Sequence, residues 1–177
     1  DGFQHIQLAR DEDIVVIDAT NPFGNGKLLP RGILREPLGA LARATGFILT
    51  RCDQATESVA ELEAKLGVLC PGIPVRKTCH RPVALWNVGT GAQLPLEALR
   101  GHTVDAVCAI GNPESFFMSL ESLGAVIRTK RAYRDHAEIP VDVLADTGFV
   151  VTTEKDAIRL TAPPPSVHAL QIALTDI

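Results

Sequence analysis

The chain has 177 residues, of which 46% are hydrophobic and 21% charged, a composition typical of a globular protein and not of a disordered chain. This length is enough for one domain or for two small lobes. The formal net charge is -4, and no block of like charge occurs. Because contact with a phosphate backbone requires a basic face, we expect no nucleic acid among the partners.

The first fifty residues alternate strand signals with loop signals. Residues 14–17 are a continuous apolar run closed by Asp18, which predicts a strand buried on both faces of a parallel sheet. The segment 21–37 is rich in Gly and Pro and predicts a long loop, of the kind that is often functional. A short helix over 36–44 and a strand over 46–50 are expected to follow.

The next segment carries a helix signal and then a break. Ser58 and Glu61 have the spacing of a capping box, and Gly67 is placed to close the helix that they begin. The Pro-containing stretch 71–74 interrupts the pattern and gives the predicted domain boundary. Residues 83–94 contain two short apolar runs around a Gly-Thr-Gly turn, which predicts a β-hairpin.

The second half repeats the alternation of strands and helices. After a strand over 104–110, Asn112 and Pro113 have the residue types of an N-cap and a first helical position. Further strands are expected at 125–127, 148–151 and 169–174. Strands that alternate with helices predict an α/β fold whose sheet is mostly parallel. In such sheets, functional residues gather in the loops at the carboxyl ends of the strands.

Several residues in these loops have side chains that suit phosphate chemistry. Asp18 closes its strand as a magnesium-associated acid does, although an Asp at this position commonly caps a turn, which is the favoured interpretation. Arg35, beside Glu36, could hold a phosphate with its forked donors or pair with a local carboxylate. His136, which follows Asp135, could act in proton transfer or lie in a simple turn. No segment matches the phosphate-binding pattern G-x-x-x-x-G-K-[ST].

An ordered set of short motifs resembles the tetraacyldisaccharide 4'-kinase family over nearly the whole chain. In the first half the motifs are Asp1-Gly2-Phe3-Gln4-His5, Leu8-Ala9-Arg10-Asp11, Pro22-Phe23-Gly24-Asn25-Gly26, Leu28-Leu29-Pro30 and Leu34-Arg35-Glu36-Pro37. In the second half they are His80-Arg81-Pro82, residues 110–117, Asp135-His136 and residues 152–157. Each motif is weak alone, and the order and spacing make the set specific.

The resemblance implies a membrane-associated kinase of lipid A biosynthesis. Such an enzyme transfers the γ-phosphate of ATP, with Mg²⁺, to the 4'-hydroxyl of a tetraacyldisaccharide 1-phosphate at the cytoplasmic face of the bacterial inner membrane. The implied fold is a P-loop NTPase-like lobe and a second α/β lobe joined through a β-hairpin. Residues 1–74 then belong to the P-loop kinase lobe, and residues 75–177 form the hairpin linker and the second lobe.

The resemblance also implies roles for individual residues. Asp1 matches an acid at the magnesium and the reacting phosphate, and Gln4 and His5 belong to the same cofactor-binding motif. Arg35 and Glu36 match an active-site pair. His136 matches a histidine that supports the catalytic base. The magnesium ligand is therefore expected at Asp1 and not at Asp18.

Two hypotheses about the whole protein follow. In the preferred one, the chain is the C-terminal portion of a working kinase, and the P-loop and a membrane-binding segment belong to a preceding portion. This chain alone is then expected to be inactive. In the alternative, the chain is a non-catalytic remnant or a sugar-lipid binding fragment, which the missing P-loop and a short segment between His136 and Thr152 would favour.

Overall fold

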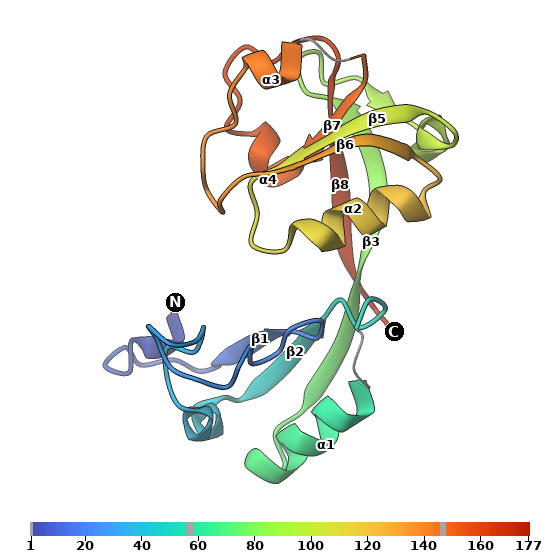
Figure 1. Cartoon of the computed structure of the whole chain (residues 1–177). Coiled ribbons are helices and arrows are strands. Elements are labelled where there is room, and N and C mark those ends of the chain that lie inside the picture. The colour runs from blue at the N-terminus through green and yellow to red at the C-terminus, as the bar shows by residue number, and fades with distance from the viewer. Residues whose placement is uncertain (1, 56–58, 146–147) are drawn as a thin grey trace. The chain divides into compact units, whose positions relative to one another are not determined.

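The computed structural model describes residues 2–55, 59–145 and 148–177. They divide into two units, Asp1–His80 with Leu174–Ile177 and Arg81–Ala173 (Figure 1). Strand β3 (Val75–Asn87) contributes to both units, and so does β8 (Val167–Asp176). The domain boundary predicted from the sequence lies just before β3, whereas the two units divide within β3. The reason is that the chain continues past the Pro-containing turn as one extended strand.

The first unit is built on parallel strands. β1 (Ile14–Asp18) pairs with β2 (Gly46–Thr50), and β2 pairs with the beginning of β3. The connections hold a 3₁₀ turn, η2 (Leu38–Arg43), and the helix α1 (Val59–Leu69). A further 3₁₀ turn, η1 (Gly2–Gln4), lies near the start of the chain. The core of the unit combines apolar side chains of β1, β2 and α1, among them Ile17, Phe47, Leu49, Leu62 and Leu66.

Three local expectations for this unit need correction. β1 is not buried on both faces among the described residues, since Val16 keeps 62% of its surface exposed. The helix expected over 36–44 is the shorter 3₁₀ turn η2. Gly67 lies inside α1 and does not close it, since the helix continues to Leu69. The cap predicted at Ser58 lies outside the described residues.

The second unit contains a sheet in the order β3-β8-β7-β5-β6, to which β4 is added on β3. Its remaining strands are β4 (Gln93–Leu94), β5 (Thr103–Cys108), β6 (Val126–Ala132) and β7 (Val150–Thr153). Its helical elements are η3 (Leu96–Leu99), α2 (Pro113–Ser122), α3 (Asp142–Ala145) and α4 (Glu154–Ala157). β5 is parallel to both β6 and β7, and β7 is parallel to β8.

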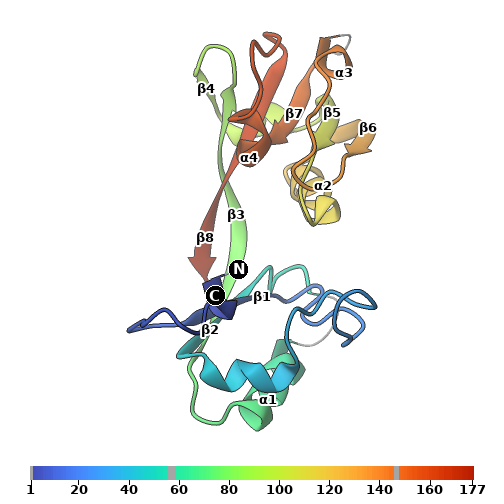
Figure 2. The same ribbon diagram turned by 90° about the vertical axis from the view of Figure 1, so that its left-hand side faces the viewer.

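Several predictions for this unit are confirmed. β3 and β4 form the expected hairpin, with Leu85 opposite Leu94 in antiparallel register (Figure 2). Asn112 caps α2, because its side chain accepts a hydrogen bond from the backbone N–H of Ser115 at 3.2 Å, and Pro113 begins the helix. The mixed α/β class is confirmed for the chain as a whole. The described part of the chain contains no helix of the length and apolarity needed to cross a membrane.

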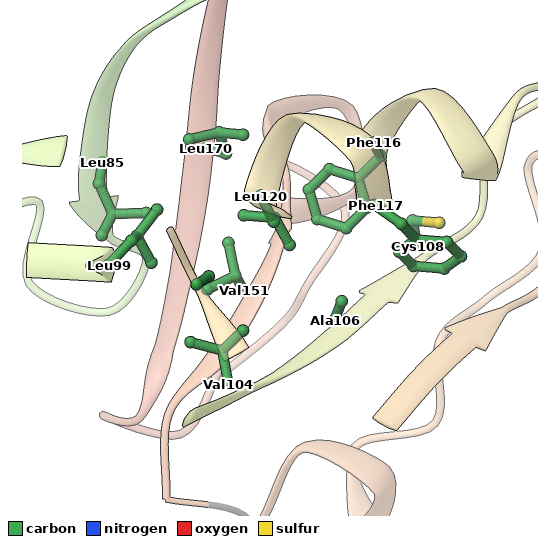
Figure 3. Close-up of a cluster of buried hydrophobic side chains, with 11 residues drawn as sticks. Leu85, Leu99, Val104, Ala106, Cys108, Phe116, Phe117, Leu120, Val151 and Leu170 are labelled. Atoms are coloured by element: carbon green, nitrogen blue, oxygen red, sulfur yellow. The ribbon is translucent and has the colours of Figure 1, made fainter. Parts of the chain in front are cut away.

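One buried hydrophobic cluster of the second unit lies between α2 and the sheet. α2 directs Leu120 toward Val151 of β7 and Leu170 of β8, and Phe117 packs beside Cys108 of β5 (Figure 3). All of these side chains are buried. Burial raises the pKa of the Cys108 thiol to about 12, so this cysteine stays protonated and acts as a small core residue.

Candidate functional site

A cavity of about 650 Å³ in the first unit collects several of the residues singled out in the sequence. Gln4 contributes from η1, and Arg35 and Glu36 contribute from the end of the Gly- and Pro-rich loop. The remaining wall is largely apolar and comes from β1 and from residues around Phe23 and Leu38. Because the loop between β1 and η2 folds back over the strand, it carries Arg35 to the same hollow as η1.

Glu36 is fixed in this cavity by Arg43. The guanidinium of Arg43 donates to both carboxylate oxygens of Glu36, at 2.9 and 3.0 Å, in a bidentate pair. The same guanidinium lies 4.5 Å from the ring centroid of Phe3 and donates to the Phe3 carbonyl at 3.3 Å. Arg43 therefore ties the acidic end of the loop to η1.

The segment after η1 is held by Arg10. Its guanidinium pairs with Asp13 at 2.7 Å and donates to the backbone carbonyl of His5 at 2.6 Å and to that of Gly2. His5 lines a second cavity of about 480 Å³, formed by residues 4–8. Asp1, the predicted metal ligand and catalytic acid, lies outside the described residues.

Asp18 is held by neighbouring groups as a turn residue. One carboxylate oxygen accepts hydrogen bonds from the backbone and the hydroxyl of Thr20, at 3.0 and 2.7 Å. The other oxygen pairs with Arg51 at 2.6 Å. Burial, with Arg51 as the second cause, lowers the pKa of nearby His80. Both Asp18 oxygens thus have protein donors, which suits a structural role.

Metal ions are held in proteins by clusters of ligand side chains. Among residues 2–55, 59–145 and 148–177, no group of three or more His, Cys, Asp or Glu side chains is arranged to hold a metal ion.

His136 lies in the second unit, where the carboxyl ends of three parallel strands meet. β5 runs into Ala109, β6 leads to Asp135 and His136, and β7 runs into α4. His136 is exposed, and its Nε2 lies 3.8 Å from a carboxylate oxygen of Asp135. A hydrogen bond from Lys155 is the main cause that lowers the pKa of Asp135. A neighbouring carboxylate and an accessible imidazole are suited to proton transfer.

Sequence reasoning did not find the residues that hold these groups in place. These are Arg10, Arg43, Lys155 and Arg159, which contact His5, Glu36, Asp135 and His136 over five to twenty-three positions of sequence. Arg10 and Lys155 do lie in motifs that carry the family resemblance, and this was the available signal. Arg43 and Arg159 had none, because in the sequence an isolated arginine resembles any solvated residue.

Comparison with known proteins decides the family. The profile of the tetraacyldisaccharide-1-P 4'-kinase family, LpxK, matches residues 1–176. The chain belongs to this family. A tetraacyldisaccharide 4'-kinase of Anaeromyxobacter sp. strain K is 43% identical over 171 residues, which are 92% of this chain and 45% of that protein. The enzyme of Halothermothrix orenii is 36% identical over 91% of this chain and 47% of its own length.

A solved structure agrees with this assignment. The crystal structure of LpxK from Aquifex aeolicus in complex with ATP matches the chain with a TM-score of 0.70 and 26% identity. The match covers all of this chain and 52% of that one. The resemblance to an LpxK fold inferred from the sequence motifs is therefore confirmed, and the chain spans about half the length of its LpxK relatives.

Proposed function

We propose that this chain forms part of a lipid A 4'-kinase, which transfers the γ-phosphate of ATP to the 4'-hydroxyl of a tetraacyldisaccharide 1-phosphate. The observation that carries the proposal is the family match over residues 1–176, together with the cavity that gathers Gln4, Arg35 and Glu36. Phosphoryl transfer depends mainly on positioning and on positive charge around the moving group. A cavity lined by an arginine and a fixed acid suits that task.

Each site residue then has a distinct task. Arg35 places a guanidinium where charge develops on the transferring phosphoryl group. Glu36, locked by Arg43, keeps the loop that carries Arg35 in one conformation. His136, beside Asp135, helps to orient the group that takes the proton from the attacking sugar hydroxyl. Magnesium, when bound through Asp1, would neutralise phosphate charge.

The same proposal places the enzyme at the cytoplasmic face of the bacterial inner membrane. ATP is dissolved in the cytoplasm, whereas the acyl chains of the substrate lie in the bilayer, so the reaction requires a protein at the boundary. A membrane-binding segment outside this chain would provide the attachment. Flotation of the full-length protein with anionic vesicles tests this placement: recovery in the floating fraction supports it, and recovery only in the dense fraction contradicts it.

The decisive experiment is a transfer assay with the full-length protein. Radiolabelled γ-phosphate should pass from ATP to the acylated disaccharide 1-phosphate, and Arg35→Ala should lower kcat by at least about a hundredfold, the scale of losing one charge-stabilising group. Arg31→Ala is the matched control, because it removes an exposed arginine of the same loop. Absence of transfer by the wild-type protein, or equal rates for Arg35→Ala and Arg31→Ala, would contradict the proposal.

A histidine variant tests the second unit separately. His136 has a φ of +63°, a conformation that asparagine tolerates better than most residues. His136→Asn therefore removes the imidazole with little backbone strain. We expect kcat to fall between about a hundredfold and ten-thousandfold, as for loss of an acid–base group. An unchanged kcat would remove His136 from the mechanism.

A further inference from the structure

Arg159 makes direct contact with the backbone of the turn that presents His136. Its Nη2 donates to the carbonyl of His136 at 2.6 Å and to the carbonyl of Ala137 at 3.1 Å. Arg159 follows α4 and is far from the turn in sequence, so the contact is a tertiary one. One terminal NH₂ group thus donates to two adjacent carbonyls, and the planar guanidinium fixes the directions of its N–H bonds.

The turn needs such support because its backbone is strained. His136 has a positive φ of +63°, which residues with a Cβ seldom adopt and which persists only where the surroundings hold it. One further tie is the hydrogen bond from the His136 N–H to the Ala109 carbonyl at 3.2 Å. Another is the ion pair of Lys155 with Asp135, at 2.8 Å. The hydrogen bonds from Arg159 to the carbonyls of His136 and Ala137 add to these two contacts.

The guanidinium of Arg159 is itself directed by a buried carboxylate. Asp156 is only 2% exposed, and one of its oxygens accepts hydrogen bonds from the Ala109 N–H at 2.9 Å and the Thr153 hydroxyl at 2.7 Å. Its other oxygen has no hydrogen-bond partner among the residues that the structure describes and lies 3.9 Å from Nη1 of Arg159. An unsatisfied buried carboxylate oxygen attracts a neighbouring cation strongly, because little water screens it.

These contacts connect the end of β5 to the His136 turn. The Asp156 carboxylate accepts a hydrogen bond from the Ala109 N–H, and the Ala109 carbonyl accepts one from the His136 N–H. Arg159 lies beside the Asp156 carboxylate and donates a hydrogen bond to the carbonyl of His136 in the same turn. The backbone N–H and the backbone C=O of His136 are therefore both held by hydrogen bonds, and these fix the point from which the imidazole projects.

We propose that Arg159 is a positioning residue that acts through His136, by holding the strained backbone from which the imidazole projects. The inference rests on the proposed kinase function and goes beyond it, because it gives a role to a residue that has no place in the transfer chemistry itself. Small misplacements of a reacting group are costly: a shift of about 1 Å can cost about a hundredfold in rate.

The test compares variants of the full-length enzyme. Arg159→Ala removes the fork, and Arg159→Lys keeps the charge but cannot hold both carbonyls in the same way. Arg100→Ala is the matched control, since Arg100 is an exposed arginine of the same unit. The side chain of Arg159 is 35% exposed, so its truncation leaves the core of the unit intact.

Two readouts separate positioning from a general loss of structure. We expect Arg159→Ala to lower kcat by at least about tenfold with KM unchanged, and millimolar guanidinium to restore part of the loss. In the His136→Asn background the same change should have no further effect, because the two residues act as one unit. Arg159→Lys should lie between the wild type and Arg159→Ala, and Arg100→Ala should match the wild type.

The third readout does not depend on activity. Hydrogen exchange of the peptide covering residues 133–139 should become at least about tenfold faster in Arg159→Ala, while exchange in β7 is unchanged. If exchange in that peptide is unchanged, or if the kcat effects of Arg159→Ala and His136→Asn simply multiply, the inference is wrong. Failure of the kinase proposal would look different: the wild type would transfer no phosphate, and the exchange result would still decide whether Arg159 holds the turn.

Discussion

Both carboxylate oxygens of Glu36 accept hydrogen bonds from the guanidinium of Arg43, at 2.9 and 3.0 Å. This ion pair joins the end of the long loop to the 3₁₀ turn η2. The hydrogen bond to Glu36 is also the main cause that raises the pKa of Arg43. Because the pair lies at the wall of the cavity in the first unit, its importance is expected in activity more than in stability.

Replacement of Arg43 by Gln should therefore separate these two properties. The variant loses the bidentate grip on Glu36 and the contact with the Phe3 ring, so the loop that carries Arg35 is less well placed. We expect kcat/KM of the full-length enzyme to fall about tenfold, while the urea midpoint of unfolding hardly moves. A large drop in the midpoint with unchanged kcat/KM would show that the pair is purely structural.

Truncation of Leu120 should destabilise the second unit strongly. Leu120 is fully buried between α2 and the sheet, so Leu120→Ala leaves a cavity among Val151, Leu170 and their neighbours (Figure 3). The expected loss in free energy of unfolding is about 2–5 kcal/mol, measured by urea denaturation. Met118→Ala on the same helix is the control, because Met118 is 47% exposed and its loss should cost much less.

His168 should make stability depend on pH on the acid side of neutrality. Burial lowers the pKa of His168 from its ordinary value of 6.5, and its ring stacks on Phe149 with centroids 4.3 Å apart. Since the unfolded chain binds the proton more readily, stability is complete above pH 6.5 and decreases as the pH falls below it. His168→Asn should flatten the pH dependence of the urea midpoint between neutral and mildly acidic pH.

The test of His168 requires a comparison that separates its effect on the pH dependence of stability from that of the other histidines. His80 also has a lowered pKa and contributes its own slope, so the informative quantity is the difference between the wild type and His168→Asn. His102→Asn, which removes an exposed histidine of the same unit, controls for the effect of a histidine-to-asparagine change on the urea midpoint at neutral pH. Parallel pH profiles for the wild type and His168→Asn would show that His168 is protonated equally in both states.

Asp105 should also make stability decrease as the pH falls, in a lower pH range than His168. Its buried carboxylate receives hydrogen bonds from Arg128 and, at 2.5 Å, from Thr129, and the bond from Arg128 is the main cause that lowers its pKa from 3.8. Its stabilising effect is therefore complete above pH 3.8 and disappears as the pH falls through the lower folded value.

The matching variant is Asp105→Asn, compared with Asp11→Asn at an exposed position. At neutral pH we expect Asp105→Asn to lose about 1–3 kcal/mol of unfolding free energy, because the charge that receives these hydrogen bonds is gone. The difference from the wild type should shrink as the pH is lowered below 3.8. A difference that stays constant across that range would mean that the carboxylate is not ionised in the folded protein.

The sequence determined what depends on neighbouring residues. The cap at Asn112 with Pro113, the hairpin of β3 and β4, and the order of strands and helices all follow from short patterns, and the structure has them. The ordered motifs also identified the family. In the structure, Gln4, Arg35 and Glu36 line one cavity. The roles proposed for these residues and for Asp1 and His136 remain predictions.

Only the tertiary structure decided which side chains support the site and how far each strand is buried. The exposure of Val16 depends on which segments cover that face of β1, and a one-dimensional apolar run carries no information about them. The hydrogen bond from Arg43 to Glu36 joins residues seven positions apart, and the one from Arg159 to the carbonyl of His136 joins residues twenty-three positions apart. Such contacts arise because folding brings distant segments to one place, and only then can a hydrogen bond form between them.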